Sequence, residues 1–155
     1  MDQPTTLDNN LKLKTMQLST AVARGVWQIA QDLKATLVVT WSQTGATARI
    51  FSKMRFPVPV IALSSDHRAL RRMALHYGVV PQEMAPPADM ASLVQDVDEL
   101  VTQKQWAPAG SRILIVAGSS LGTPSTLNGV VIHTVGETWK PADEQKASPK
   151  FMEVP

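Results

Sequence analysis

The chain has no cysteine among its 155 residues, which excludes disulfides, thiolate metal sites and cysteine nucleophiles. It also has no apolar run of about 18 residues, the length that would predict a transmembrane helix. The polar beginning, MDQPTTLDNN, contains no signal-peptide core. Charge of one sign is not in excess, because 15 basic and 13 acidic residues give a net charge of +2. This balance argues against nucleic acid or a membrane surface as a partner, and we expect a soluble, cytoplasmic protein.

Signs of catalytic or metal chemistry are also scarce. The three histidines, His67, His76 and His133, have no carboxylate or second histidine at metal-ligand spacing. Ser42 and Ser119 lack the Gly-x-Ser-x-Gly elbow of a hydrolase nucleophile and have no obvious histidine base. We therefore expect no catalytic residue, no metal and no cofactor in this chain.

The remaining composition, 44% hydrophobic and 18% charged, is typical of one globular domain. We divide the chain into a polar, irregular N-terminal arm (1–18), a domain (19–136) and a polar tail (137–155). Apolar spacing predicts helices over residues 20–35, 45–54, 66–78 and 90–105, and strands over 37–41, 60–63, 79–81, 113–117 and 130–135.

Strands that alternate with helices predict an α/β fold, a three-layer αβα sandwich around a mostly parallel five-stranded sheet. The expected strand order is 3-2-1-4-5. The last strand is expected to be antiparallel, because no helix-length segment separates it from the strand before it. In such sheets ligands bind at the carboxyl ends of the strands where the strand order reverses, here between the first and fourth strands.

The stretch LVVTWSQTGATAR (37–49) has the composition of an anion site at that point. A buried strand leads into a loop rich in hydroxyls and then into a helix, whose N-terminus presents free N–H groups and the positive end of its dipole. It is not a nucleotide-hydrolase phosphate loop, because no Gly-Lys-Ser/Thr follows. The alternative is an ordinary capped turn. A second small-residue loop, 118–129, follows the fourth strand.

Four ordered motifs resemble the C-terminal domain of pyruvate kinases over residues 19–136. They are SQTGATAR (42–49), MRFPVPVIA (54–62), GVVP (78–81) and AGSSLGTPSTLN (117–128). The resemblance implies a regulatory domain that assembles subunits, while catalysis resides in a separate barrel of about 250 residues. We therefore expect no kinase activity from this chain alone. If it is part of a longer protein, that protein would be a glycolytic pyruvate kinase.

The resemblance also implies an effector site in which the first loop holds a phosphate and the later loop closes over it. Its residues would be Ser42, Gln43, Thr44, Gly45, Ala46, Thr47, Gly122, Ser125 and Thr126, with Arg49 a candidate charge partner. Gln43 stands where relatives often have a charged residue. The helix over 90–105 lacks the Trp and Arg that some relatives use for a second phosphate, and it carries Asp96, Asp98 and Glu99. These differences favour a sugar monophosphate, inorganic phosphate or sulfate over a bisphosphate.

Two other functions stay open at this point: a free-standing enzyme acting on a small phosphorylated metabolite, and a ligand-free assembly module. We expect a homo-oligomer, a dimer or larger, from the resemblance and from Trp27 and Gly25 in the first helix, although for Trp27 itself we favour a place in the core over a subunit contact. We interpret the basic residues at 67–72 as a solvated face, with an interface or an anion contact as the alternative. Asp89, Asp96, Asp98 and Glu99 are interpreted as a solvated acidic face.

Overall fold

Five strands form one sheet in the order β3-β2-β1-β4-β5. The computed structural model describes residues 6–118 and 127–140. Its strands are β1 (Val38–Trp41), β2 (Val60–Ser64), β3 (Val79–Glu83), β4 (Arg112–Gly118) and β5 (Leu127–Thr134), and its helices are α1 (Thr6–Asp32), α2 (Ala46–Lys53), α3 (His67–Met73) and α4 (Met90–Gln103). The first four strands are parallel and β5 is antiparallel to β4. The predicted strand order and the antiparallel last strand are confirmed.

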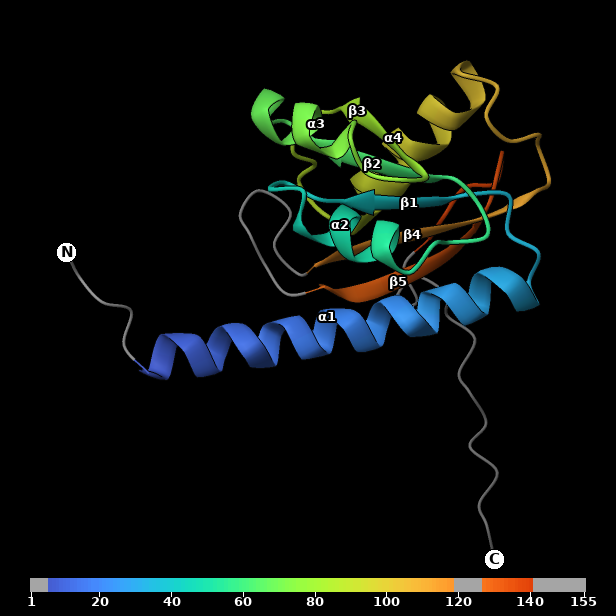
Figure 1. Cartoon of the computed structure of the whole chain (residues 1–155). Coiled ribbons are helices and arrows are strands. Elements are labelled where there is room, and N and C mark those ends of the chain that lie inside the picture. Colours follow the sequence, from blue (N-terminus) through green and yellow to red (C-terminus); the bar gives the residue numbers. More distant parts are fainter. Residues whose placement is uncertain (1–5, 119–126, 141–155) are drawn as a thin grey trace, which may run out of the picture.

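Helices cover both faces of the sheet, which gives the three predicted layers (Figure 1). On one face α1, α2 and α3 pack against alternate strand residues such as Val38, Val60 and Leu114. On the other face α4 packs against the intervening residues, such as Val39 and Ile115. The strands β1, β2 and β4 are therefore buried on both sides, which is why they read as continuous apolar runs in the sequence.

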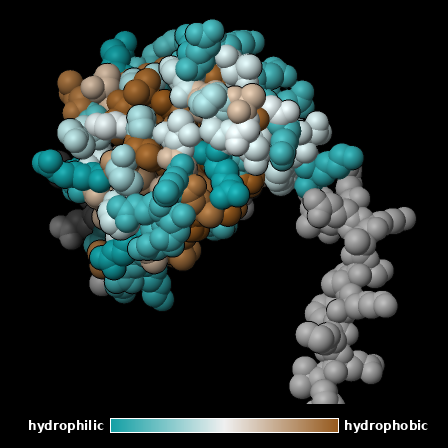
Figure 2. All heavy atoms as spheres, turned by 90° about the vertical axis from the view of Figure 1, so that its right-hand side faces the viewer, coloured by the Kyte–Doolittle hydropathy of each residue, from teal (hydrophilic) through white to brown (hydrophobic). Residues whose placement is uncertain are grey.

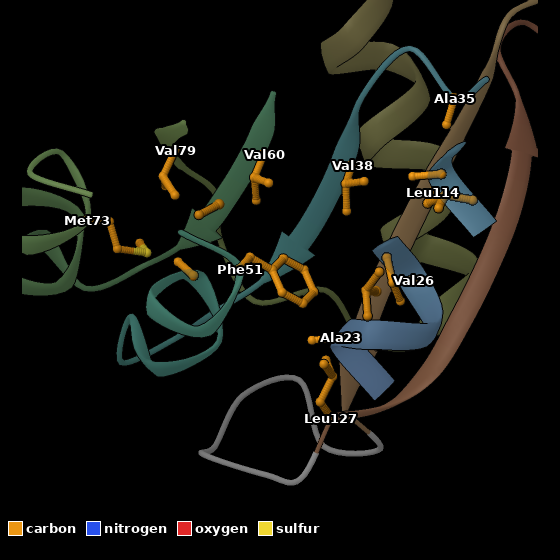
Figure 3. Close-up of a cluster of buried hydrophobic side chains, with 14 of the residues drawn as sticks. Ala23, Val26, Ala35, Val38, Phe51, Val60, Met73, Val79, Leu114 and Leu127 are labelled. Atoms are coloured by element: carbon orange, nitrogen blue, oxygen red, sulfur yellow. The ribbon is translucent and has the colours of Figure 1, made fainter. Parts of the chain in front are cut away.

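Phe51 anchors the short helix α2 to the sheet. Its side chain is fully buried and points from α2 into the cluster between Val26 of α1 and Met73 of α3 (Figure 3). Its ring also lies 4.7 Å from that of Phe56, centroid to centroid. An eight-residue helix is too short to be stable in water by itself, so this packing holds the loop before α2 in place.

The N-terminal segment differs from the expectation, because α1 begins at Thr6 and continues to Asp32. The prediction of an irregular arm up to residue 18 is therefore wrong from Thr6 onward. No glycine or proline interrupts residues 5–24, so nothing in this polar stretch opposes a helix. The N-terminal half of α1 extends beyond the sheet (Figure 1) and leaves Leu11, Leu13 and Met16 exposed.

Two features of α1 bear on the expected subunit contact. Trp27 is half-buried. A Cβ built on Gly25 would meet no atom within 4 Å, so within the described residues this glycine marks no close approach.

At the end of the molecule where α1 finishes, hydrophilic side chains cover most of the surface, with smaller hydrophobic patches between them (Figure 2). No helix in the described ranges has the length and apolar character needed to cross a membrane.

Candidate anion-binding site

The predicted loop lies where the strand order reverses. β1 sits between β2 and β4, ends at Trp41 and is followed by residues 42–45 and the first turn of α2. The second loop, with Gly122, Ser125 and Thr126, falls outside the described residues. Whether those three residues join the site therefore stays a prediction.

Ser42 builds the loop from inside the protein. It is 3% exposed, and its Oγ accepts a hydrogen bond of 3.3 Å from the backbone N–H of Ala48, in the first turn of α2. Its own backbone N–H donates to the carbonyl of Leu63 in β2 at 2.8 Å. Ser42 thus satisfies one of the N–H groups that a helix N-terminus leaves without a partner, and its hydroxyl is already engaged within the protein.

Gly45 occupies the turn between the loop and α2 for two reasons. Its φ of +88° lies in the left-handed region, which glycine adopts without steric cost. A Cβ at this position would also lie only 3.2 Å from Cγ of Met73. Gly45 is the N-cap residue of α2 and offers no side-chain acceptor, so the N-terminus of this helix lacks the usual capping group.

Gln43 is held by the loop that follows β2. Its Nε2 donates to Oγ of Ser65 at 2.7 Å, and its Oε1 accepts from the backbone N–H of Ser65 at 3.3 Å. Ser64 donates from its hydroxyl to the backbone carbonyl of Gln43 at 2.9 Å. Asp66, rather than either serine, caps α3. The side chain of Gln43 is therefore a brace between two loops.

Thr44 and Thr47 offer the hydroxyls that remain available. Thr44 is exposed and Thr47 half-buried. In the part of the chain that the structure describes, no hydrogen bond engages either hydroxyl, nor the backbone N–H groups of Ala46 and Thr47. These four donors lie within four consecutive residues at the N-terminus of α2. Together with the helix dipole they form an arrangement that favours an anion.

A cation reaches this loop from α3. Nη2 of Arg72 donates to the backbone carbonyl of Thr44 at 3.1 Å, so a guanidinium lies beside the N-terminus of α2. Arg49, the predicted charge partner, is exposed and has no ion pair within the described residues. For the basic residues at 67–72 the sequence favoured a solvated face and offered an anion contact only as the alternative, because residue spacing does not connect Arg72 with Thr44, 28 residues away, or distinguish it from Arg71.

Two acidic residues of the predicted solvated face have defined partners instead. The side chain of Asp89 caps α4 and accepts from the backbone N–H of Ser92 at 2.8 Å. That N–H, and then the Ser92 hydroxyl, hold the pKa of the Asp89 carboxyl below its usual value. Oδ1 of Asp98 lies 2.7 Å from Nε2 of the buried His133 and accepts from the backbone N–H of Gly136 at 2.8 Å. Asp96 and Glu99 are exposed.

Other titratable groups near this edge of the sheet are solvated. Nε2 of His67 lies 3.4 Å from Oε1 of Glu83, but the two side chains are 70% and 60% exposed. Solvent screens such a pair, so it resembles a surface contact rather than a catalytic acid and base. The described residues contain no group of three or more His, Asp or Glu placed to hold a metal ion.

The comparisons with known proteins agree with the fold. A family model described as "Pyruvate kinase, alpha/beta domain" matches residues 20–133. A pyruvate kinase of Dictyostelium discoideum is 33% identical over 127 residues, which are 82% of this chain and 25% of that protein. A pyruvate kinase of Sporosarcina psychrophila is 26% identical over 137 residues, 88% of this chain and 23% of that protein.

A pyruvate kinase of Lactococcus lactis is 29% identical over 114 residues, 74% of this chain and 22% of that protein. The chain thus spans about a quarter of the length of the curated relatives it matches. The resemblance that the four motifs predicted is confirmed. Since the family model covers more than half of the chain, this chain belongs to the pyruvate kinase α/β domain family.

Proposed function

We propose that this domain binds a phosphate-bearing ligand at the loop after β1 and acts as the regulatory and assembly domain of a glycolytic pyruvate kinase. The observation that carries the proposal is the hydrogen bond from Arg72 to the carbonyl of Thr44. It sets a permanent positive charge beside the hydroxyls of Thr44 and Thr47 and the free N–H groups of α2. A guanidinium next to a helix N-terminus suits a phosphate group.

The same arrangement supports one phosphate more than two. In the described loop and helices the cation that contacts the loop is Arg72, while Gln43 contributes a neutral side chain that is already hydrogen bonded. A monophosphate, inorganic phosphate or sulfate matches one guanidinium and one helix N-terminus. A sugar bisphosphate would need a second cationic group.

A thermal-shift titration tests the proposal with phosphate, sulfate, ribose 5-phosphate, glucose 6-phosphate, fructose 1,6-bisphosphate and AMP. A ligand at 100 times its dissociation constant stabilises the folded state by about 2.7 kcal/mol. For a domain of this size that is a rise of about 5–10 °C in Tm. We expect the rise with at least one monophosphate, and we expect it to disappear in the Thr44→Ala/Thr47→Ala double variant.

Arg72→Gln is expected to weaken the same ligand about two- to fivefold, the usual strength of an exposed charge contact. Arg71→Gln is the matched control, because it removes the same charge from the same turn of α3 without touching Thr44. Equal weakening by the two variants would show only a general effect of surface charge. If no ligand changes the Tm, the proposal of phosphate binding fails and the alternative of a ligand-free assembly domain is favoured.

Self-association is the second part of the proposal. β5 is an edge strand of the sheet, and edge strands normally carry charges or prolines that oppose pairing. Here Val130 and Ile132 are 38% and 52% exposed on that edge. α1 lies alongside β5 (Figure 1) and adds the exposed Leu13 and Met16. A second copy of the chain would cover this apolar surface.

Sedimentation velocity at increasing protein concentration tests the association. Ile132→Lys is expected to shift the distribution toward monomer, because it places a charge on the edge strand. Leu75→Lys introduces the same charge at a residue that is 87% exposed outside this edge, and it should leave the distribution unchanged. Monomer alone at every concentration would refute the association.

An enzyme acting on a small phosphorylated metabolite is less well supported, because the acid–base pair near the site, His67 and Glu83, is exposed. Pyruvate kinase activity would require a catalytic barrel of about 250 residues, which is more than the whole length of this chain. The regulatory role therefore applies to a protein in which such a barrel accompanies this domain. The cytoplasmic location stays a prediction.

A further inference from the structure

A cavity lies between the first two turns of α4 and the segment after β5. Its volume is about 350 Å³, and Asp89, Val94, Gln95, His133, Glu137 and Trp139 are among the residues that line it. This is near the lower end of the volumes of small-molecule sites. Residues 137–139 lie after the stretch that the family model matches.

The wall formed by residues 137–139 is held against α4. Asp98 of α4 accepts the backbone N–H of Gly136 at 2.8 Å and contacts Nε2 of His133 at 2.7 Å. The backbone N–H of Glu137 donates to the carbonyl of Thr134 at 3.1 Å. Trp139 packs, half-buried, on the core beneath α4. These contacts preorganise the cavity, which lowers the entropic cost of binding a ligand there.

The polar groups at the cavity are mostly hydrogen-bond acceptors. Asp89 is ionised near neutral pH, and its carboxylate accepts a hydrogen bond from the backbone N–H of Ser92 at 2.8 Å. The amide nitrogen of Gln95 donates to Glu99 at 3.4 Å, which leaves its oxygen to face a ligand. Glu137 adds a second carboxylate, and none of the described lining residues is Lys or Arg. The cavity therefore favours a ligand that donates hydrogen bonds and carries positive charge.

His133 also lines this cavity. Its side chain is 3% exposed, and its Nε2 contacts a carboxylate oxygen that can only accept. In the neutral ring the proton therefore sits on Nε2 and Nδ1 is an acceptor. Among the described residues no hydrogen bond engages Nδ1. Trp139 supplies an aromatic face, and such faces attract cations.

We propose that this cavity binds a small organic amine, whose protonated amino group lies between the carboxylates of Asp89 and Glu137 and whose apolar part lies against Trp139. The proposal does not depend on phosphate binding at α2. It would give the domain a second ligand site, of opposite charge preference.

Two-dimensional NMR of the full chain tests it with phenethylamine as the probe. We expect saturable shifts of the Trp139 indole N–H and of the backbone amides of Gln95 and Glu137. The uncharged analogue 2-phenylethanol has nearly the same shape and should bind about two- to thirtyfold more weakly, because it loses the charge contacts with both carboxylates. Equal binding of the two compounds would overturn the proposal. So would shifts confined to other residues, or no shift up to the solubility limit of the amine.

Two variants and one control test which residues contribute to the affinity for phenethylamine. Glu137→Gln should weaken phenethylamine about two- to fivefold, and Trp139→Ala about two- to thirtyfold. Asp96→Asn is the matched control, since it removes one negative charge from an exposed position of α4 that does not line the cavity. If Asp96→Asn weakens the amine as much as Glu137→Gln does, the attraction is the general field of an acidic surface and the proposal fails.

Discussion

Replacing Ser42 by alanine separates loop construction from ligand binding. The hydroxyl of Ser42 accepts from the backbone N–H of Ala48, and Ala48 itself is fully buried. Without that hydroxyl the buried N–H has no hydrogen-bond acceptor among the described residues. A buried donor left without a partner costs about 1–3 kcal/mol, and loss of a side-chain acceptor for an N–H group at a helix N-terminus typically costs about 1 kcal/mol. We therefore expect Ser42→Ala to lower the free energy of unfolding by about 1–2 kcal/mol.

For a domain of this size the loss corresponds to a fall in Tm of about 2–8 °C. Urea unfolding, followed by tryptophan fluorescence, measures it directly. Thr44→Ala is the control, because an exposed side chain without partners changes stability by less than about 0.5 kcal/mol. Phosphate titration should show the opposite order, with Thr44→Ala losing more affinity. If Ser42→Ala is as stable as the parent and weakens phosphate as much as Thr44→Ala, the division of the loop into a structural and a ligand-facing part is wrong.

Three further predictions concern the supports of the two sites. Phe51→Ala should cost about 3–5 kcal/mol, because it empties a fully buried ring position, while the half-buried Phe56→Ala should lower the urea midpoint less. Asp98→Ala should cost about 1–3 kcal/mol, since it leaves His133 and the N–H of Gly136 without their acceptor; an unchanged urea midpoint would contradict this contact. The pKa of Asp89 is lower in the folded than in the unfolded state, so its stabilising effect is present above the unfolded value of about 4 and is lost as pH falls through the folded value. Asp89→Ala should therefore be less stable than the parent at pH 7, and a stability gap that persists undiminished at pH 2 would show that ionisation is not the cause.

The sheet could be predicted from the sequence because strand order and direction follow from the type and length of the segments between successive strands. Apolar strands separated by helices imply parallel neighbours, and the short interval before β5 implies an antiparallel one. The position of the anion loop follows from the same order, since β1 and β4 meet where the strand order reverses. The start of α1 was missed because a polar segment without glycine or proline is compatible with helix and coil alike.

The contacts that divide the loop residues between structure and ligand could not be predicted. Gln43 pairs with Ser65, Thr44 with Arg72, and Asp98 with His133, over 22, 28 and 35 residues respectively. Each contact depends on how two elements pack against each other. The spacing of residues within one element carries no information about that packing. The resemblance placed Gln43 among the ligand residues because of its position in the loop. Its side chain is hydrogen bonded to Ser65, and contact between Gln43 and a ligand stays a prediction.

The proposed anion would contact two elements at once, since its donors come from the N-terminus of α2 and from Arg72 of α3. α2 has eight residues and is held by packing, so it is expected to open locally at a lower free energy than the whole domain. A ligand that binds only the closed state of α2 lowers the population of the open state. At 100 times its dissociation constant it lowers that population about 100-fold.

Amide hydrogen exchange in α2 should therefore slow by about this factor when phosphate is added at 100 times its dissociation constant. Amides of α4 that open locally without disturbing α2 should be unchanged. Equal protection of α2 and α4 would mean that both exchange through global unfolding, in which case α2 has no separate opening. Exchange in α2 that does not respond to saturating phosphate would place any bound anion elsewhere, because a ligand held by the N–H groups of Ala46 and Thr47 must protect the helix that presents them.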